Sequence, residues 1–148
     1  MDMSMEMSTD HGFAPLFTTR RKVRFEHCDP AGIVFYPRYF EMINAVVEDC
    51  FSESLGSSFA ELVSSGRGVP TVSLETQFHA PSRLGDILSF SLVPKAVGRT
   101  SLSLEIIATH QAQRRLTARV TLVYIDLNTG RPLPWPDPIR QYFSINDN

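Results

Sequence analysis

The chain has 148 residues, of which 43% are hydrophobic and 20% are charged. This length and balance suit one folded domain with its own core and exclude wholesale disorder. A formal net charge of −2 provides no global positive field for binding nucleic acid. No apolar run approaches the ~20 residues of a membrane helix, and the first ten residues include acids but no basic residue, unlike a secretory signal. We therefore expect a cytoplasmic protein with neither membrane nor nucleic-acid partners.

The first half of the chain changes its periodicity twice. Residues 1–15 lack hydrophobic periodicity and are interpreted as a flexible tail, which leaves one domain over residues 16–148. Alternation over residues 17–25 indicates a half-buried strand with Phe25 on its inward face. Segment 29–32 then has Asp first, Pro second and Gly fourth, the residue order of a type I turn.

A long amphipathic helix is expected after this turn. Its apolar positions recur at spacings of three and four, at Phe40, Ile43, Val47 and Phe51. This spacing predicts a helix of about four to five turns that begins after Pro37 and ends near Gly56. A second, short helix is expected over residues 59–64.

Period-two alternation returns at Val69 and predicts four further strands. The first contains the alternating residues Val72, Leu74, Thr76 and Phe78, and the others cover residues 87–97, 101–110 and 116–126. Their short connections join antiparallel neighbours. The last segment contains Pro132, Pro134, Pro136 and Pro138 and is expected to lie extended on the surface.

This order of elements predicts an α+β domain in which a curved antiparallel sheet of about five strands wraps one helix. The exposed edges of such a sheet favour pairing between subunits. Two cysteines, Cys28 and Cys50, are too few for a disulfide framework or a four-ligand zinc site. On extended chain His27, Cys28 and Asp29 point in alternate directions, so we expect no metal site there.

Asp29 is the first candidate for chemistry. It is followed by the apolar segment 33–37, which leads directly into the expected helix. A helix start exposes unpaired backbone N–H groups and the positive end of the helix dipole. A carboxylate close to such donors, beside apolar side chains that exclude water, provides parts needed to hydrolyse an ester or thioester. The alternative is a plain Asp-Pro-x-Gly turn with no catalytic role.

Two more polar residues have both a structural and a functional interpretation. By helical spacing Asn44 falls inside the apolar stripe, where its amide would be satisfied by neighbouring backbone or would contact a ligand. Arg99 lies at a connection between strands, and its guanidinium is either solvated or bound to a phosphate. The same two interpretations apply to Arg83, Arg114 and Arg115.

The run from Val23 to Phe40, VRFEHCDPAGIVFYPRYF, resembles the signature of hot-dog-fold acyl-CoA thioesterases of the 4-hydroxybenzoyl-CoA thioesterase type. The strand order and segment 78–86 extend the resemblance over about residues 17–127. The resemblance implies a long helix gripped by an antiparallel sheet and hydrolysis of an acyl-CoA to the free acid and CoA. It also implies a homo-oligomer, a dimer or a tetramer with sites between subunits. No metal is implied, and no cofactor beyond the CoA moiety of the substrate.

The resemblance further implies roles for residues of the signature. Asp29 matches the catalytic aspartate, which acts as a nucleophile that forms an acyl anhydride or as a base for direct attack by water. The backbone N–H of Tyr36 is implied to polarise the thioester carbonyl at the helix start. Phe35 and Gly32 are implied to bind substrate beside these two groups.

Two positions outside the signature are carried over in the same way. Asn44 stands where the 4-hydroxybenzoyl enzyme has an aspartate at the ring hydroxyl. An amide can still bond a hydroxyl, but the difference argues against strict 4-hydroxybenzoyl selectivity, and we expect a compact, aromatic acyl group. Arg99 matches one of the basic residues that hold the phosphates of CoA.

Three alternative functions remain open from the sequence. One is a non-catalytic protein that binds acyl-CoA or an acyl carrier, against which the retained carboxylate argues. Another is a thioesterase for short aliphatic acyl-CoA. The third is a dehydratase, which would need a catalytic histidine facing an acid; His27, His79 and His110 lie in no dehydratase-like motif.

Overall fold

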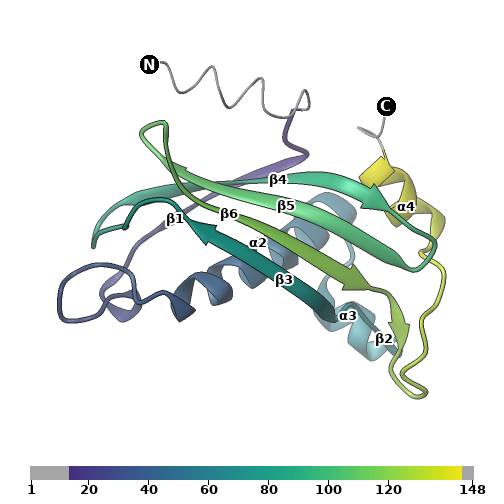
Figure 1. The fold of residues 1–148 in the computed structure, drawn as a ribbon. Coiled ribbons are helices and arrows are strands. Elements are labelled where there is room, and N and C mark those ends of the chain that lie inside the picture. Colours follow the sequence, from purple (N-terminus) through teal and green to yellow (C-terminus); the bar gives the residue numbers. More distant parts are fainter. Residues whose placement is uncertain (1–13, 145–148) are drawn as a thin grey trace.

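The sheet curves over one long helix, α2 (Pro37–Leu55), as Figure 1 shows for the computed structural model, which describes residues 14–144. Five antiparallel strands follow the order β1-β4-β5-β6-β3. Their bounds are β1 (Phe17–Lys22), β3 (Thr71–Phe78), β4 (Ile87–Val97), β5 (Ser101–His110) and β6 (Gln113–Val123). The remaining elements are η1 (Phe25–His27), α3 (Phe59–Ser64), β2 (Arg67–Gly68), β7 (Ile125–Asp126) and α4 (Asp137–Ser144). The predicted α+β class and sheet are confirmed.

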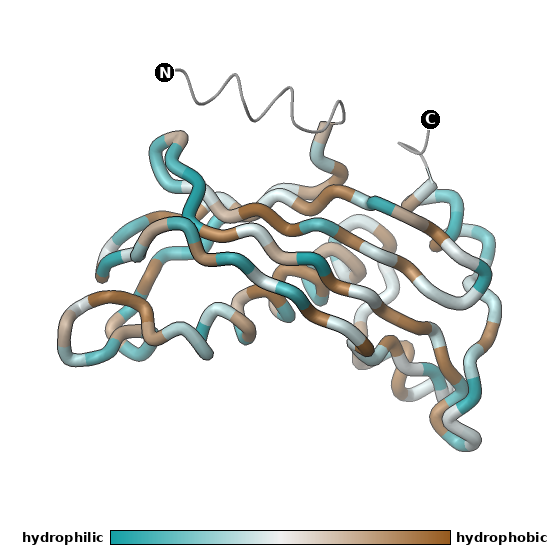
Figure 2. Tube along the Cα trace, in the orientation of Figure 1, coloured by the Kyte–Doolittle hydropathy of each residue, from teal (hydrophilic) through white to brown (hydrophobic). Residues whose placement is uncertain are grey.

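The core lies between the sheet and α2. Strands β4, β5 and β6 alternate buried and less buried residues. In Figure 2 the colour along the sheet changes between hydrophobic brown and paler or hydrophilic segments. The helix side of the core consists of Tyr39, Met42, Ile43, Val46, Val47, Cys50 and Phe51. The helix ends at Gly56, whose φ of +64° is a left-handed conformation that favours glycine at a helix end. The predicted helix and its end are confirmed.

Two strand boundaries differ from the prediction. Phe25 does not continue β1 but begins the short helix η1, and its side chain is 82% exposed. Strand β6 begins at Gln113 because Gln111 and Ala112, with φ of 51° and 67°, form the tight turn after β5. Such turns usually contain Asn and Gly, so this turn had no recognisable sequence signal.

The predicted extended surface path of the C-terminal segment is wrong for its second half. Trp135 is buried and its ring lies 5.2 Å from that of Tyr124. The helix α4 follows and places Ile139 and Phe143 in the core. Pro138 lies in the first turn of α4, where the missing N–H of a proline removes no helical hydrogen bond.

Strand β3 forms an edge of the sheet, and none of its side chains is fully buried. Its alternating apolar residues Val72, Leu74 and Phe78 are 60%, 40% and 46% exposed. Among residues 14–144, no helix is long and apolar enough to cross a membrane. Residues 1–13 of the predicted tail lie outside the described residues, so the domain boundaries stay a prediction.

Candidate active site

The loop that carries Asp29 is a short hairpin between η1 and α2. Cys28 and Val34 form an antiparallel bridge, and the N–H of Phe35 donates to the carbonyl of His27 at 2.9 Å. At its tip, the N–H of Gly32 donates to the carbonyl of Asp29 at 2.9 Å. The φ of Gly32 is +78°, a conformation that other residues adopt only with strain. The predicted turn over residues 29–32 is confirmed.

The Asp29 side chain is half-buried, and its two oxygens differ in their hydrogen bonding. Oδ1 accepts a hydrogen bond from the N–H of Ala31 at 2.9 Å, which fixes the orientation of the carboxylate. No hydrogen bond or ion pair occupies Oδ2 within residues 14–144. One oxygen therefore holds the loop, while the other can meet a substrate or a water molecule.

The start of α2 provides a free backbone donor. Tyr36 caps the helix, and Pro37 at its first position has no N–H. The next two N–H groups, of Arg38 and Tyr39, donate to the carbonyls of Phe35 and Tyr36 at 2.9 and 3.0 Å. In the described part of the chain the N–H of Tyr36 has no protein acceptor. The first turn of α2 contains no acid, so nothing there neutralises the positive end of the helix dipole.

An aromatic hollow lies beside this donor. It has a volume of about 600 Å³ and is lined by Val34, Tyr36, Tyr39, Phe78, His79, Ala80 and Pro81. The rings of Tyr36 and Tyr39 lie 6.1 and 5.6 Å from that of Phe78. Burial raises the pKa of Tyr39, against the opposing effect of hydrogen bonding with Ser82, so this phenol stays neutral. An arrangement of aromatic faces around an open volume suits a flat, apolar group.

A second segment, residues 81–86, holds the hairpin in place. The N–H of Val34 donates to the carbonyl of Ser82 at 2.9 Å, and the N–H of Leu84 donates to the carbonyl of Gly32 at 3.1 Å. Ile33 and Arg83 form a further bridge. The hairpin is thus hydrogen-bonded to a neighbouring segment of chain rather than free in solvent.

Arg115 of β6 anchors this second segment. Its guanidinium donates to the carbonyl of Pro81 at 2.9 Å, to Oγ of Ser82 at 3.1 Å and to Oδ2 of Asp86 at 2.9 Å, while Nε donates to Gln113 at 2.8 Å. Arg115 is only 8% exposed. Neither sequence interpretation of Arg115, as a solvated or a phosphate-binding residue, fits this position. Leu116 of β6 pairs with Phe78 of β3, and this register places the neighbouring Arg115 beside residues 81–86. The sequence alone did not give the register, so this position of Arg115 was not predicted.

Cys28 and His27 do not form a reactive pair. The Cys28 thiol donates to the carbonyl of Arg24 at 3.5 Å, and Nδ1 of His27 accepts from the N–H of Arg24 at 2.8 Å. Both side chains are thus directed at the backbone of η1. Within residues 14–144, no three His, Cys, Asp or Glu side chains lie close enough together to hold a metal ion.

The expectation that Asn44 lies inside the apolar stripe of α2 is wrong. Its side chain is exposed in the single chain. The buried face is centred on Ile43, Val46 and Cys50, so that Phe40 lies at its edge and Asn44 beyond it. The spacing of the apolar residues alone placed the centre of the buried stripe too close to Asn44. Phe35 is also half exposed, beside Tyr36.

Arg99 is not brought to the Asp29 hairpin within one chain. It is exposed in the turn after β4, at the opposite end of this strand from Ile87. Figure 1 shows the hairpin before α2 at one end of the molecule and the β4–β5 turn near α4 at the other. At ~3.3 Å per residue the 11 residues of β4 span ~35 Å. Any shared substrate would need Arg99 from another copy of the chain.

Comparison with known proteins identifies the family. A family model described as the Thioesterase-like superfamily matches residues 23–143. The chain belongs to this superfamily. It is a thioester hydrolase of the acyl-CoA thioesterase class, as the signature at residues 23–40 predicted.

Individual relatives of this thioesterase are known by sequence and by structure. A 1,4-dihydroxy-2-naphthoyl-CoA hydrolase of Synechococcus elongatus is 26% identical over 131 residues, which cover 85% of this chain and 93% of the relative. A crystal structure of a 1,4-dihydroxy-2-naphthoyl-CoA thioesterase from Synechocystis superimposes with a TM-score of 0.81 and 25% identity, covering 89% of this chain and 98% of the other. A gentisyl-coenzyme A thioesterase superimposes with a TM-score of 0.77 and 26% identity, covering 84% and 99%.

Proposed function

We propose that this thioesterase hydrolyses the CoA thioester of a compact aromatic acid. The observation that carries the proposal is the combination of a carboxylate with one unoccupied oxygen, an unpaired N–H at a helix start and an aromatic hollow beside that N–H. Two relatives are named for 1,4-dihydroxy-2-naphthoyl-CoA and one for gentisyl-CoA, and all three acyl groups are aromatic. The acyl ring would lie against Tyr36, Tyr39 and Phe78.

The backbone N–H of Tyr36 is the proposed oxyanion donor. The thioester carbonyl accepts this hydrogen bond, and the bond strengthens as negative charge develops on the oxygen. The helix dipole of α2 acts in the same direction. The phenol of Tyr36 takes no part in this step, so a phenylalanine at position 36 would preserve it.

Asp29 is the proposed nucleophile or general base. As a nucleophile, Oδ2 attacks the carbonyl carbon, the carbon–sulfur bond breaks with release of CoA, and water then cleaves the resulting anhydride. As a base, Oδ2 takes a proton from a water molecule while the water oxygen attacks the same carbon. Both routes consume one water and yield the free acid and CoA.

A panel of acyl-CoA substrates tests the proposed substrate class. Thiol release should give kcat/KM for benzoyl-, 4-hydroxybenzoyl- and 1,4-dihydroxy-2-naphthoyl-CoA that exceeds the value for acetyl- and hexanoyl-CoA by about tenfold to a hundredfold, because the hollow matches a ring. Faster hydrolysis of the aliphatic members would contradict the aromatic class and favour the aliphatic alternative.

A further inference from the structure

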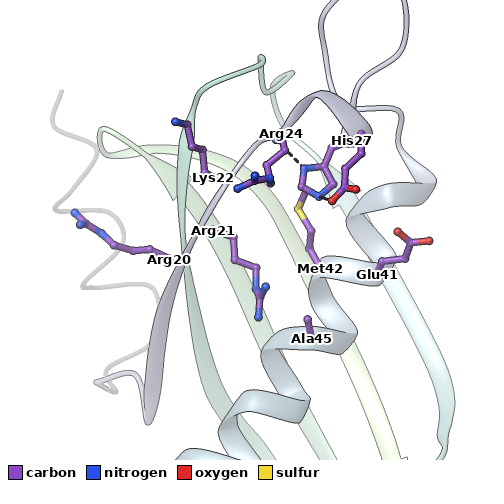
Figure 3. A pocket seen from close by; sticks show the side chains of 9 residues that line it. Arg20, Arg21, Lys22, Arg24, His27, Glu41, Met42 and Ala45 are labelled. Carbon is purple, nitrogen blue, oxygen red and sulfur yellow. Dashed lines mark hydrogen bonds and ion pairs between the residues drawn. The ribbon is translucent and has the colours of Figure 1, made fainter.

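His27 closes the turn that precedes the Asp29 hairpin. Its backbone N–H donates to the carbonyl of Arg24 at 2.9 Å, and Nδ1 of its ring accepts the N–H of Arg24 at 2.8 Å. Residues 24 and 27 thus exchange two hydrogen bonds, and a dashed line in Figure 3 joins the ring to Arg24. Because one of the two bonds ends on a side chain, the closed form of η1 depends on the histidine ring.

The same residue begins the hairpin that carries both proposed catalytic groups. Its carbonyl accepts the N–H of Phe35 at 2.9 Å, and the N–H of Asp29 donates to the carbonyl of Ile33 at 3.0 Å. Asp29 therefore lies two residues beyond His27 on one side of the hairpin. Tyr36 follows the bonded Phe35 on the other side. The η1 turn and the hairpin meet at His27.

The bond between the His27 ring and Arg24 requires an unprotonated Nδ1. A backbone N–H can only donate, so Nδ1 is the acceptor and the ring proton lies on Nε2. Protonation at Nδ1 replaces this acceptor by a donor and sets two N–H groups against each other. His110 differs, because its Nδ1 lies 2.9 Å from the carbonyl of Ile87 and can donate to it in the neutral and in the charged form. Of these two rings, only His27 loses a hydrogen bond on protonation.

Charged groups of both signs surround the His27 side chain, which is 17% exposed. Its Nε2 lies 3.8 Å from the Glu26 carboxylate. Glu41 of α2 borders the same hollow between β1 and α2 and pairs with Arg38 at 3.2 Å. The other charged side chains that line this hollow are Arg20, Arg21, Lys22 and Arg24. A protonated ring thus has an acidic partner in Glu26, but it has then lost its bond to Arg24.

We propose that neutral His27 is a positioning residue for thioester hydrolysis. By closing η1 it fixes the first strand of the hairpin, and with it the place of Asp29 relative to the N–H of Tyr36. Protonation of the ring opens the turn and lowers the rate of hydrolysis. This inference rests on the proposed roles of Asp29 and Tyr36, and it assigns to His27 no contact with the substrate.

Two substitutions of the same shape test the acceptor. In His27→Asn the amide oxygen can take the place of Nδ1, whereas His27→Leu has a side chain of similar shape without an acceptor. At about pH 8, kcat for an aromatic acyl-CoA should fall by about tenfold in His27→Leu and stay within about twofold of the wild type in His27→Asn. KM should change little in either variant. Equal losses of kcat in the two variants would contradict the role of the acceptor.

A pH profile separates positioning from a merely structural role. The charge of a histidine ring changes between about pH 5 and pH 8, so kcat of the wild type should fall by about tenfold over this range. His27→Asn has no ring to protonate and should keep its rate. His110→Asn is the control and should show the fall of the wild type. An equal fall in His27→Asn, or a fall removed by His110→Asn, would overturn the proposal, even if His27→Leu fails to fold.

NMR of the ring nitrogens separates this inference from the proposed function. At about pH 8 the His27 signals should show an unprotonated Nδ1 and a protonated Nε2. Hydrogen exchange of the Arg24 amide should be about tenfold faster in His27→Leu than in His27→Asn. If both results hold but no thioester is hydrolysed, the hydrolysis proposal fails although neutral His27 closes the turn. If thioesters are hydrolysed and the proton lies on Nδ1, the positioning role of His27 fails alone.

Discussion

Arg115 connects the sheet to the catalytic hairpin through side-chain and backbone hydrogen bonds. Its guanidinium holds Ser82 and Asp86, and the backbone of this segment holds Val34 and Gly32 of the hairpin. The orientation of Asp29 therefore depends on Arg115, which lies more than 80 residues away in sequence. A buried arginine with four acceptors is stable only while all of them are present.

We expect Arg115→Met to destabilise the fold by about 3 kcal/mol, because it leaves Asp86 and the Ser82 hydroxyl without their donor. Urea denaturation measures this free energy of unfolding. Arg119→Met, on the same strand but 48% exposed, is the control and should change it by less than about 1 kcal/mol. Equal effects of the two substitutions would show that the ion pair between Arg115 and Asp86 has no special importance.

Asp86 should make the fold sensitive to acid. Partial burial alone would raise the pKa of Asp86, but hydrogen bonds from Arg83 and Arg115, together with the positive charges of His110 and Arg115, hold it below its ordinary value. The ionised carboxylate therefore stabilises the native state above the ordinary pKa of ~3.9, and this contribution is lost as the pH falls through the lower pKa of the folded state.

Denaturation of the wild type and Asp86→Asn across a pH series measures that contribution. The wild type should be the more stable protein at neutral pH, and the difference should shrink below about pH 4. A difference that stays constant down to about pH 2 would contradict the assignment of this pH dependence to Asp86.

At the scale of elements, regular periodicity made the sequence informative. The α2 helix, α3 and strands β4 and β5 were predicted with their observed bounds or nearly so, because each has apolar residues at one clear period. The Asp29 turn was predicted because its Asp, Pro and Gly positions each have a physical requirement. The helix was predicted to begin after Pro37, and a proline fits the first turn of a helix. The donor role of the Tyr36 N–H at this helix start was implied by the resemblance alone.

The features that sequence missed depend on tertiary contacts. The Arg115 network requires the register of β6 against β3, and the aromatic hollow requires Phe78 to lie beside α2. Asn44 was misplaced because four apolar positions did not define the centre of the buried face. The short helix α4 has only eight residues behind a run of prolines, too few for a reliable period.

The helix α4 should contribute strongly to stability although its sequence suggested a surface segment. Phe143 is 1% exposed and its ring lies 5.6 Å from that of Phe51 of α2. We expect Phe143→Ala to lower the free energy of unfolding by about 3–4 kcal/mol through loss of buried area and creation of a cavity. Gln141→Ala, on the exposed side of α4, is the control, and urea denaturation measures both variants. If both substitutions change the free energy of unfolding by an equally small amount, α4 does not contribute to the core.

At the scale of the molecule, β3 presents an unpaired edge with apolar side chains. Within residues 14–144 its backbone pairs only with β6, and Val72, Leu74 and Phe78 remain exposed. An edge of this kind is a template for pairing with another chain, and exposed apolar side chains of this extent suit an interface. Phe78 also lines the aromatic hollow, so such pairing would cover part of the candidate active site.

We expect the protein to form a homo-oligomer through β3, and Leu74→Lys to weaken it because a charge at an edge opposes strand pairing. Light scattering should give a mass at least twice the 16.6 kDa of the chain for the wild type and a lower mass for Leu74→Lys at the same concentration. Thr71→Lys, at the start of the same strand, tests whether the effect is centred on the apolar residues. A wild type that remains a monomer would contradict the expectation.

The most direct test of the catalytic account compares Asp29→Asn with Asp126→Asn. Both aspartates accept the N–H two residues ahead, at 2.9 and 2.8 Å, so the two substitutions change similar turns. Only Asp29 is proposed to attack or to activate water. Thiol release from an aromatic acyl-CoA should fall by about a hundredfold to ten-thousandfold in Asp29→Asn and stay near the wild-type rate in Asp126→Asn, with both variants folded. A rate for Asp29→Asn close to that of the wild type would contradict the account.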